Sequence, residues 1–528
     1  MYPILPKTNG PVVAGEGRVA VPETFAVAYN GFDPLCTRAY FARTGSREAA
    51  EPVWITLGKE TMEAEAYRLQ VTSDGVTVAA ATETGVIWAL TTLFQLGMAD
   101  GTVPVCTLSD APKHGHRGLS FDCVRHFFPV DAVKNVIEQL ALVKMNVLHW
   151  HLTDAEGWRV ESKVFPKLHE TSDQYYTQEQ IRDIVDFAGE RGVEIIPEID
   201  MPGHSTAFLA AYPHLSCTGE EVHIGTPSTL ILCAGKESTY EFLEKLLEEV
   251  CDLFPCNRFH IGGDEAVKSA WRNCPHCRKR MEEEGLENLE ELQGWFTVRV
   301  QKMLRSHGKE MVCWNDVLKA KTRPQQMLPQ YWTLQHAESM MEYYLTGGKF
   351  IYSEMFELYL DYPHSMNSLK KVYSCNPHIY NVDCTEAPGL VGLEACLWSE
   401  HIPTPEKLYK RLFPRCQALA ENAWSRERDY EDFKARLKPI LAYAQAQGIT
   451  GVEESGWDPT GEEKIEDAIQ YLKGMFGLVA SATSGEAAGM LEEMGLSMDV
   501  IIQMMSLFFE QDEIPRVMAE LKAMFTNG

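Results

Sequence analysis

The first part of the chain has the pattern of a small α/β domain. Residues 65–82 contain the segments EAYRLQV and VTVAAAT, which are joined by a Ser-Asp-Gly turn, and this order predicts a β-hairpin. Residues 85–98 then carry apolar residues at helical spacing. The turn-rich segment 109–118 follows and indicates a domain boundary. We therefore predict a small α/β domain over residues 1–112.

From Arg117 onward the pattern changes to strands that alternate with helices. Amphipathic stretches such as 131–145 and 178–192 separate most of the strand segments, which are dense in apolar residues as a buried barrel requires. Eight strands, each followed by a helix or a long excursion, fit a closed parallel barrel better than an open sheet. We predict an α/β fold with a (β/α)8 TIM barrel over residues 113–429. Its strands are expected at 117–124, 146–154, 193–200, 258–264, 310–316, 327–332, 349–355 and 392–399.

Residues 430–528 are predicted to form a C-terminal helical region. Segments 430–448 and 462–477 are amphipathic, and segment 498–525 is rich in Met and Phe. Such a stripe is more often part of a core than a partner site. A homodimer through these C-terminal helices is the second interpretation.

Polar residues recur at one topological position of the predicted barrel. Asp154, Asp200, Asp264, Asp316 and Ser399 lie at the carboxyl ends of their strands. That end of a (β/α)8 barrel carries the chemistry. Several carboxylates at this position indicate a shared acidic pocket lined by aromatic residues.

The run Gly262-Gly263-Asp264-Glu265 ends one of these strands. Consecutive side chains of extended chain point to opposite sides, so the two carboxylates are expected to address different parts of one substrate. They are poorly placed to act as a retaining pair about 5 Å apart across one glycosidic bond. Their mutual repulsion should raise one of the two pKa values. Taken alone, the run also suits a turn or a hard-cation site.

Composition limits the partners and the compartment. The net charge of −27 argues against nucleic acid and anionic membranes, although acidity also serves solubility. No apolar run reaches the 18 or so residues of a membrane span, and the first residues lack a secretory pattern. Fourteen cysteines in a chain of this length are not a dense disulfide framework. We expect a reducing compartment, the cytoplasm, although a trimmed secreted chain would have the same pattern.

Several long motifs resemble those of the family 20 glycoside hydrolases, the β-N-acetylhexosaminidases. The first match covers residues 117–159. It is followed, in the family's order, by EIIPEIDMPGHSTA, HIGGDEA, VCWNDVL, ELYLDYP and GLEACLWSEHI, so the resemblance extends over residues 115–425. The resemblance implies exo-hydrolysis of glycans that end in β-linked N-acetylglucosamine or N-acetylgalactosamine. It also implies substrate-assisted catalysis, in which the sugar's 2-acetamido oxygen attacks the anomeric carbon and forms an oxazoline-type intermediate. Neither a cofactor nor a catalytic metal is implied.

The resemblance assigns catalytic roles by position in the motifs. Glu265 would be the general acid and then the general base, while Asp264 would stabilise the acetamido nitrogen. Tyr359 would hydrogen-bond the acetamido oxygen, and Asp154 and His204 would support Glu265 through hydrogen bonds. The family commonly has a second Asp after the position of Asp154, whereas this chain has alanine there. We expect activity to survive with a changed local network.

The remaining positions would bind the sugar. Arg125, Asp361 and Glu400 would contact hydroxyl groups, with a structural ion pair as the alternative for Arg125. Tryptophans would enclose the ring and the acetamido methyl, because apolar aromatic faces suit both groups. These are Trp314, Trp332 and Trp398. A lone tryptophan is usually a core residue, but three at the ends of three barrel strands favour a pocket.

The cysteines leave their own alternatives open. Cys274 and Cys277 form one C-x-x-C pair, whereas a structural zinc needs four ligands. Free thiols or a loop staple are therefore preferred to zinc. Cys217 and Cys233 bracket an excursion after the third barrel strand, and the sequence leaves their pairing undecided.

Two other functions remain as alternatives. A lacto-N-biosidase of the same family would release a disaccharide from a more open pocket. A non-catalytic carbohydrate-binding barrel would be expected to have lost Glu265 or Asp264, and both are present.

Overall fold

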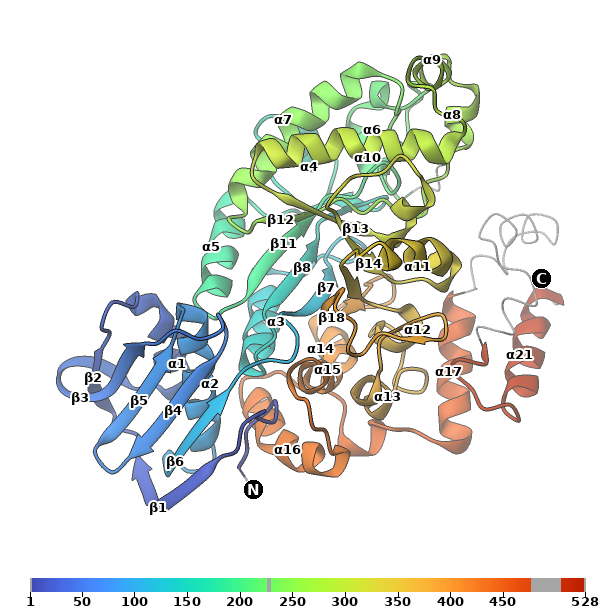
Figure 1. The fold of residues 1–528 in the computed structure, drawn as a ribbon. Helices are drawn as coiled ribbons and strands as arrows, with labels where there is room; N and C mark the ends of the chain where they lie inside the picture. Colours follow the sequence, from blue (N-terminus) through green and yellow to red (C-terminus); the bar gives the residue numbers. More distant parts are fainter. Residues whose placement is uncertain (1, 226–228, 476–504, 527–528) are drawn as a thin grey trace.

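The computed structural model describes residues 2–225, 229–475 and 505–526. A six-stranded sheet at the N-terminal side precedes a closed barrel, and helices follow it (Figure 1). The predicted α/β barrel fold is confirmed. Among the described residues, no helix combines the length and apolar character that a membrane crossing requires.

The N-terminal sheet has the strand order β1-β6-β4-β5-β3-β2. Its strands are β1 (Val13–Ala20), β2 (Thr24–Ala28), β3 (Arg47–Lys59), β4 (Tyr67–Thr72), β5 (Gly75–Ala80) and β6 (Thr102–Asp110). The expected hairpin is the antiparallel β4–β5 pair, whose turn closes between Thr72 and Gly75. Two helices accompany the sheet, α1 (Arg38–Thr44) and α2 (Glu83–Gly97).

Helix α2 joins the sheet to the barrel. It begins at Thr82, whose side chain accepts a hydrogen bond from the Gly85 N–H and so caps the helix. Trp88 on this helix is fully buried and packs edge to face on Trp424 of the barrel, with ring centroids 6.5 Å apart. The helix is apolar on most sides because it contacts both parts of the protein.

Eight parallel strands close the barrel in the order β11-β12-β13-β14-β15-β18-β7-β8. They are β7 (His116–Asp122), β8 (Val147–His151), β11 (Glu194–Glu198), β12 (Arg258–His260), β13 (Glu310–Trp314), β14 (Leu328–Tyr331), β15 (Phe350–Tyr352) and β18 (Leu390–Leu397). Each overlaps one of the predicted strands. The main helices outside the barrel are α3 (Val130–Leu142), α5 (Gln178–Gly189), α7 (Glu237–Leu253), α10 (Leu289–Ser306), α11 (Ala337–Leu345), α14 (Pro405–Leu412) and α15 (Arg415–Trp424).

The barrel interior is more polar than the apolar strand pattern predicts. Buried Glu394 hydrogen-bonds to His116 at 2.7 Å and to His149 at 2.8 Å, while Glu198 contacts His149 at 3.1 Å and His260 at 3.0 Å. Burial opposes ionisation of Glu198, but the neighbouring histidines hold its pKa well below the usual range. Buried charge is tolerated here because each carboxylate has positive or hydrogen-bonding partners.

Three helices form the described C-terminal region: α16 (Tyr430–Ala446), α17 (Gly461–Met475) and α21 (Ile514–Thr526). Helix α16 packs beside the N-terminal part, where Tyr443 contacts Phe94 of α2, whereas α17 and α21 pack on the side of the barrel that holds Tyr359 (Figure 1). Met505, Phe508 and Phe509 are buried in one cluster with Tyr359 and Trp314 of the barrel. The described part of the Met/Phe-rich segment is therefore core, as the first interpretation predicts, and residues 498–504 lie outside the described residues. The homodimer stays a prediction.

Candidate active site

One pocket opens at the carboxyl ends of the barrel strands. All the predicted site residues except Asp361 line it. Asp200, expected as a rim carboxylate without an assigned role, and His151, which the site prediction omits, line it as well. The lining residues are Arg125, His151, Asp154, Asp200, His204, Asp264, Glu265, Trp314, Trp332, Tyr359, Trp398 and Glu400.

The segment that follows β12 turns sharply and brings two carboxylates to the same side. Gly262 and Gly263 have φ of 65° and 96°, and Glu265 has φ of 45°. A Cβ on Gly262 would lie 1.9 Å from Asp200 Oδ1, so only glycine fits there. The expectation that Asp264 and Glu265 point apart is wrong, because it assumed extended backbone.

Both carboxylates converge on one imidazole. His204 Nε2 lies 3.6 Å from Asp264 Oδ2 and 3.5 Å from Glu265 Oε2. Its Nδ1–H donates to Asp154 Oδ1 at 2.9 Å. His204 has a φ of 46°, a left-handed conformation that is uncommon outside glycine and that aims the ring at this position.

Asp154 is the buried anchor of this arrangement. Its Oδ2 lies 2.8 Å from an Arg125 guanidinium nitrogen and 2.9 Å from His151 Nε2. Burial alone would raise the pKa of Asp154, but Arg125 and His204 hold it well below the usual range. Burial opposes the charge on His204, yet Asp154 and Asp264 raise its pKa well above 6.5.

His151 connects the pocket to the barrel interior. Its Nδ1–H donates to Glu198 at 2.5 Å, and Glu198 also accepts from Trp314 Nε1 at 2.9 Å. Side chains alternate along a strand, so His149 and His151 of β8 point to the same side. This spacing could have identified His151 from the sequence. At the position of the family's second Asp, the Ala155 N–H donates to Asp154 Oδ1 at 2.5 Å.

Asp264 retains unused hydrogen-bonding capacity. Its Oδ1 is buried and has no hydrogen-bond partner among the described residues. Burial, then the charge of Asp200, raises the pKa of Asp264 well above its usual range, and Glu265 adds to this shift. The pKa of Asp264 therefore rises, and burial contributes more to this rise than repulsion from the neighbouring carboxylates does. Burial also raises the pKa of Asp200 to about 7.

Aromatic rings form one side of the pocket, and we call them the aromatic wall: Trp314, Trp332, Tyr359 and Trp398. Trp332 and Tyr359 are stacked with ring centroids 6.3 Å apart and planes 14° apart. Trp398 lies 5.9 Å from Trp314 and 6.2 Å from Tyr359. The Trp332 Nε1–H donates to Asp316 at 2.9 Å, which fixes the orientation of its ring. These faces suit the apolar side of a sugar ring and a methyl group.

Arg125 and Glu400 line the pocket next to Trp398. The Arg125 guanidinium is 5.2 Å from the Trp398 ring centroid, and its Nε is 4.0 Å from Glu400. Arg125 therefore forms the ion pair given as its alternative role, with Asp154, and also lines the pocket. Glu400 is about half exposed, at 47% of its side chain, so it is free to bind a polar ligand.

Asp361 lies beside the pocket and not in its lining. Its Oδ2 accepts a hydrogen bond from Tyr471 of α17 at 3.2 Å. Burial, reinforced by the charge of Glu400, raises its pKa to about 7. Its contact with sugar hydroxyls stays a prediction.

The fold and the site define a class: a (β/α)8 barrel whose rim carboxylates, imidazole and aromatic wall suit a glycoside. Residues 114–427 match the glycosyl hydrolase family 20 catalytic domain, and residues 22–111 match domain 2 of the same family. The chain belongs to glycosyl hydrolase family 20.

Individual relatives agree with this assignment. A β-hexosaminidase of Porphyromonas gingivalis is 33% identical over 75% of this chain and 56% of its own length. A β-hexosaminidase of Vibrio furnissii is 33% identical over 68% of this chain and 65% of its own length. The chain thus spans less than two thirds of these relatives. The structure of a family 20 exo-β-N-acetylglucosaminidase from Vibrio harveyi with N-acetylglucosamine has a TM-score of 0.77 at 30% identity, covering 85% of this chain and 78% of that one.

Proposed function

We propose that this protein is an exo-β-N-acetylhexosaminidase that releases terminal β-linked N-acetylglucosamine or N-acetylgalactosamine from glycans with retention of configuration. The relatives named above support a β-hexosaminidase activity. The retaining, substrate-assisted reaction goes further and is supported by the arrangement of the pocket.

The free Oδ1 of Asp264 carries the proposal. It is a buried acceptor without a donor among the described residues, in a pocket that also holds Glu265 and the aromatic wall. A buried acceptor left unpaired costs about 1–3 kcal/mol, so a ligand that brings a donor is favoured. The N–H of a sugar's 2-acetamido group is such a donor, and its methyl group suits the aromatic wall.

The pocket residues then have defined parts in the reaction. The acetamido oxygen attacks the anomeric carbon while Glu265 gives its proton to the departing glycosidic oxygen. Asp264 accepts from the amide nitrogen, which gains positive charge, and Tyr359 donates to the amide oxygen. Glu265 then takes a proton from the water that opens the oxazoline. Two inversions at the same carbon give retention, and the built-in nucleophile gains the effective molarity of a preset geometry.

The other carboxylates of the pocket are already engaged. Asp154 is held by Arg125, His151 and His204. Asp200 accepts from the Gly263 N–H at 3.1 Å and is buried. With Asp264 assigned to the amide and Glu400 to sugar hydroxyls, Glu265, whose side chain is 62% exposed, is left to reach the leaving oxygen at the mouth.

A pair of substrates with the same aryl leaving group tests this function. The purified chain should hydrolyse the aryl 2-acetamido-β-glucoside and leave the aryl β-glucoside nearly untouched, since only the first carries the nucleophile. NMR of the first sugar released should show the β-anomer before mutarotation. Equal turnover of the two glycosides, or first release of the α-anomer, contradicts the substrate-assisted reaction.

We further propose that the protein works in a reducing compartment, the cytoplasm, in which its 14 cysteines remain thiols. Cell fractionation with antibody detection of the chain tests this location.

A further inference from the structure

Four cysteines from separate segments meet outside the barrel rim. Cys217 follows the short helix η2 (Pro213–Leu215), and Cys233 precedes α7. Cys274 and Cys277 lie at the start of α9 (Pro275–Glu284). The four Sγ atoms all lie within 4.8 Å of one another, and three of the four cysteines are buried. The single C-x-x-C pair seen in the sequence is therefore joined by a second pair from the preceding excursion.

The sulfur–sulfur distances are those of a tetrahedral metal site. Cys233 Sγ lies 3.7 Å from Cys277 Sγ and 3.8 Å from Cys274 Sγ, and Cys217 Sγ lies 3.8 Å from Cys277 Sγ. Zinc–thiolate bonds of about 2.3 Å place tetrahedral sulfurs about 3.8 Å apart. A disulfide needs sulfurs at about 2.05 Å, and all four cysteines are free thiols. The cluster thus has the spacing of a ligand set and not that of two staples.

The two backbone turns that carry the cysteines approach each other closely. A Cβ on Gly235 would lie 2.2 Å from the carbonyl carbon of His276. Only glycine allows the two cysteine-bearing turns to approach this closely.

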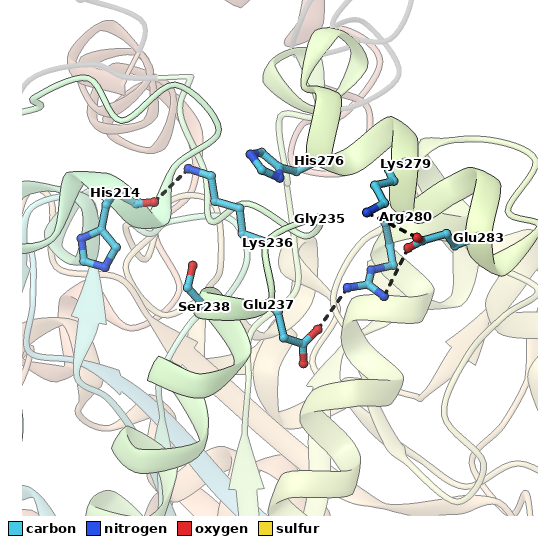
Figure 2. Close-up of a pocket in the computed structure, with 9 residues that line it drawn as sticks. All are labelled: His214, Gly235, Lys236, Glu237, Ser238, His276, Lys279, Arg280 and Glu283. Carbon is cyan, nitrogen blue, oxygen red and sulfur yellow. Dashed lines mark hydrogen bonds and ion pairs between the residues drawn. The ribbon is translucent and has the colours of Figure 1, made fainter.

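A pocket lined by basic and acidic side chains lies next to the cysteine-bearing turns. Figure 2 shows Lys236, Lys279 and Arg280 around the pocket that Gly235 and His276 also line. Lys236 Nζ donates to the carbonyl oxygens of His214 at 2.9 Å and of Ser216 at 2.5 Å, which fixes the turn before Cys217.

We propose that Cys217, Cys233, Cys274 and Cys277 bind a structural zinc ion. Four protein ligands close the coordination sphere, so the ion would have no open position for catalysis. It would tie the excursion after β11, which carries His204, to the excursion after β12, which carries Asp264 and Glu265.

Hydrogen bonds connect the zinc-binding turns to both of these excursions. The Leu232 N–H donates to Pro202 O at 3.2 Å, two residues before His204. Trp271 Nε1–H donates to Leu232 O at 3.0 Å from the segment after Glu265. Loss of the ion should therefore loosen the loops that position the catalytic groups.

Metal analysis of the full-length chain tests the site. Protein purified in reducing buffer without chelator should contain about one zinc per chain by mass spectrometry of the elements. A Cys274→Ser/Cys277→Ser variant should lose most of that zinc, whereas a Cys251→Ser/Cys256→Ser variant should keep it. The control pair is matched because Cys251 and Cys256 are also buried and lie outside the cluster.

A spectroscopic measurement on the wild-type chain covers the case in which the serine variant does not fold. Cobalt(II) added to the zinc-free protein should give sulfur-to-cobalt charge-transfer bands and the strong visible bands of a tetrahedral thiolate site. All 14 thiols should react in denaturant without reductant. The proposal would be overturned by a wild-type chain that contains no zinc and gives no such bands. It would also be overturned by iron in place of zinc, or by only ten reactive thiols instead of 14. Equal zinc in both double variants would overturn it too.

Discussion

Replacement of Asp264 by asparagine keeps the shape of the side chain but removes the carboxyl group that can be charged when the substrate nitrogen becomes positive. Asp264 Oδ2 faces His204 Nε2 at 3.6 Å, and Oδ1 has no partner among the described residues. In the variant, the amide oxygen is expected to face the imidazolium, since His204 is a donor. The amide NH2 then occupies the position of Oδ1, where it opposes the substrate N–H with a second donor.

The size of the effect follows from the hydrogen bond that is lost. A hydrogen bond to a charged group contributes about 1.5–3 kcal/mol, and each 1.36 kcal/mol is a factor of ten in rate. We expect kcat/KM for an aryl 2-acetamido-β-glucoside to fall about 10- to 150-fold. The loss should lie mainly in kcat, because the nitrogen becomes positive only as the oxazoline forms.

Inhibitors separate this effect from a general loss of structure. A thiazoline mimic of the cyclic intermediate should bind the Asp264→Asn variant more weakly by a similar factor. An inhibitor of the same ring without the acetamido group should bind both proteins within about twofold. As a charge control, Asp183→Asn on α5 removes a carboxylate that is 57% exposed and pairs with Lys134. A kcat/KM within about threefold of wild type for Asp264→Asn would refute the reasoning.

Three further changes test other parts of the site. Glu265→Gln should lower kcat about 10²-fold or more for glycosides with poor leaving groups. The loss should be far smaller for a dinitrophenyl glycoside, because dinitrophenolate leaves without a proton. Equal losses for the two substrates would show that Glu265 is not the acid. Tyr359→Phe should lower kcat about 2- to 10-fold, because the hydroxyl donor is lost. The melting temperature should stay close to that of wild type, because the ring stacked on Trp332 is kept. An unchanged kcat would contradict the contact with the amide oxygen. Asp361, with a folded pKa of about 7 above its unfolded value, contributes stability that is full below about pH 4 and is lost as the pH rises through 7. Wild type should therefore lose more unfolding free energy between pH 5 and pH 8 than Asp361→Asn does, by on the order of a few kcal/mol, and its melting temperature should fall further. Equal falls of the two melting temperatures in differential scanning fluorimetry would contradict the assignment.

Most of the fold was predictable because it depends on local patterns. The hairpin of β4 and β5 has a short turn between strands that pair within 20 residues, and the eight barrel strands have strong apolar runs. The boundaries predicted at residues 112 and 429 stay predictions. The polar barrel centre was missed because His149 and Glu198 lie inside otherwise apolar strands and meet only when β8 and β11 pair side by side.

The site was predictable as a set of residues and not as a geometry. Motif resemblance identified Asp264 and Glu265, but the alternation argument for their directions assumed extended backbone, which the positive φ of Glu265 excludes. Asp361 was expected in the pocket, and burial against Tyr471 places it beside the lining.

The sequence by itself determined the alternation of strands and helices, the glycine pair before Asp264 and the family motifs, since all of these are written in neighbouring residues. The tertiary structure alone decided that Asp264 and Glu265 meet at His204 and that four thiols gather in one place. Cys217 and Cys277 are 60 positions apart, and the carboxylates and His204 come from different strand ends. Such distances along the chain become contacts only when the parallel strands close and align their carboxyl ends, because that closure fixes where each loop begins.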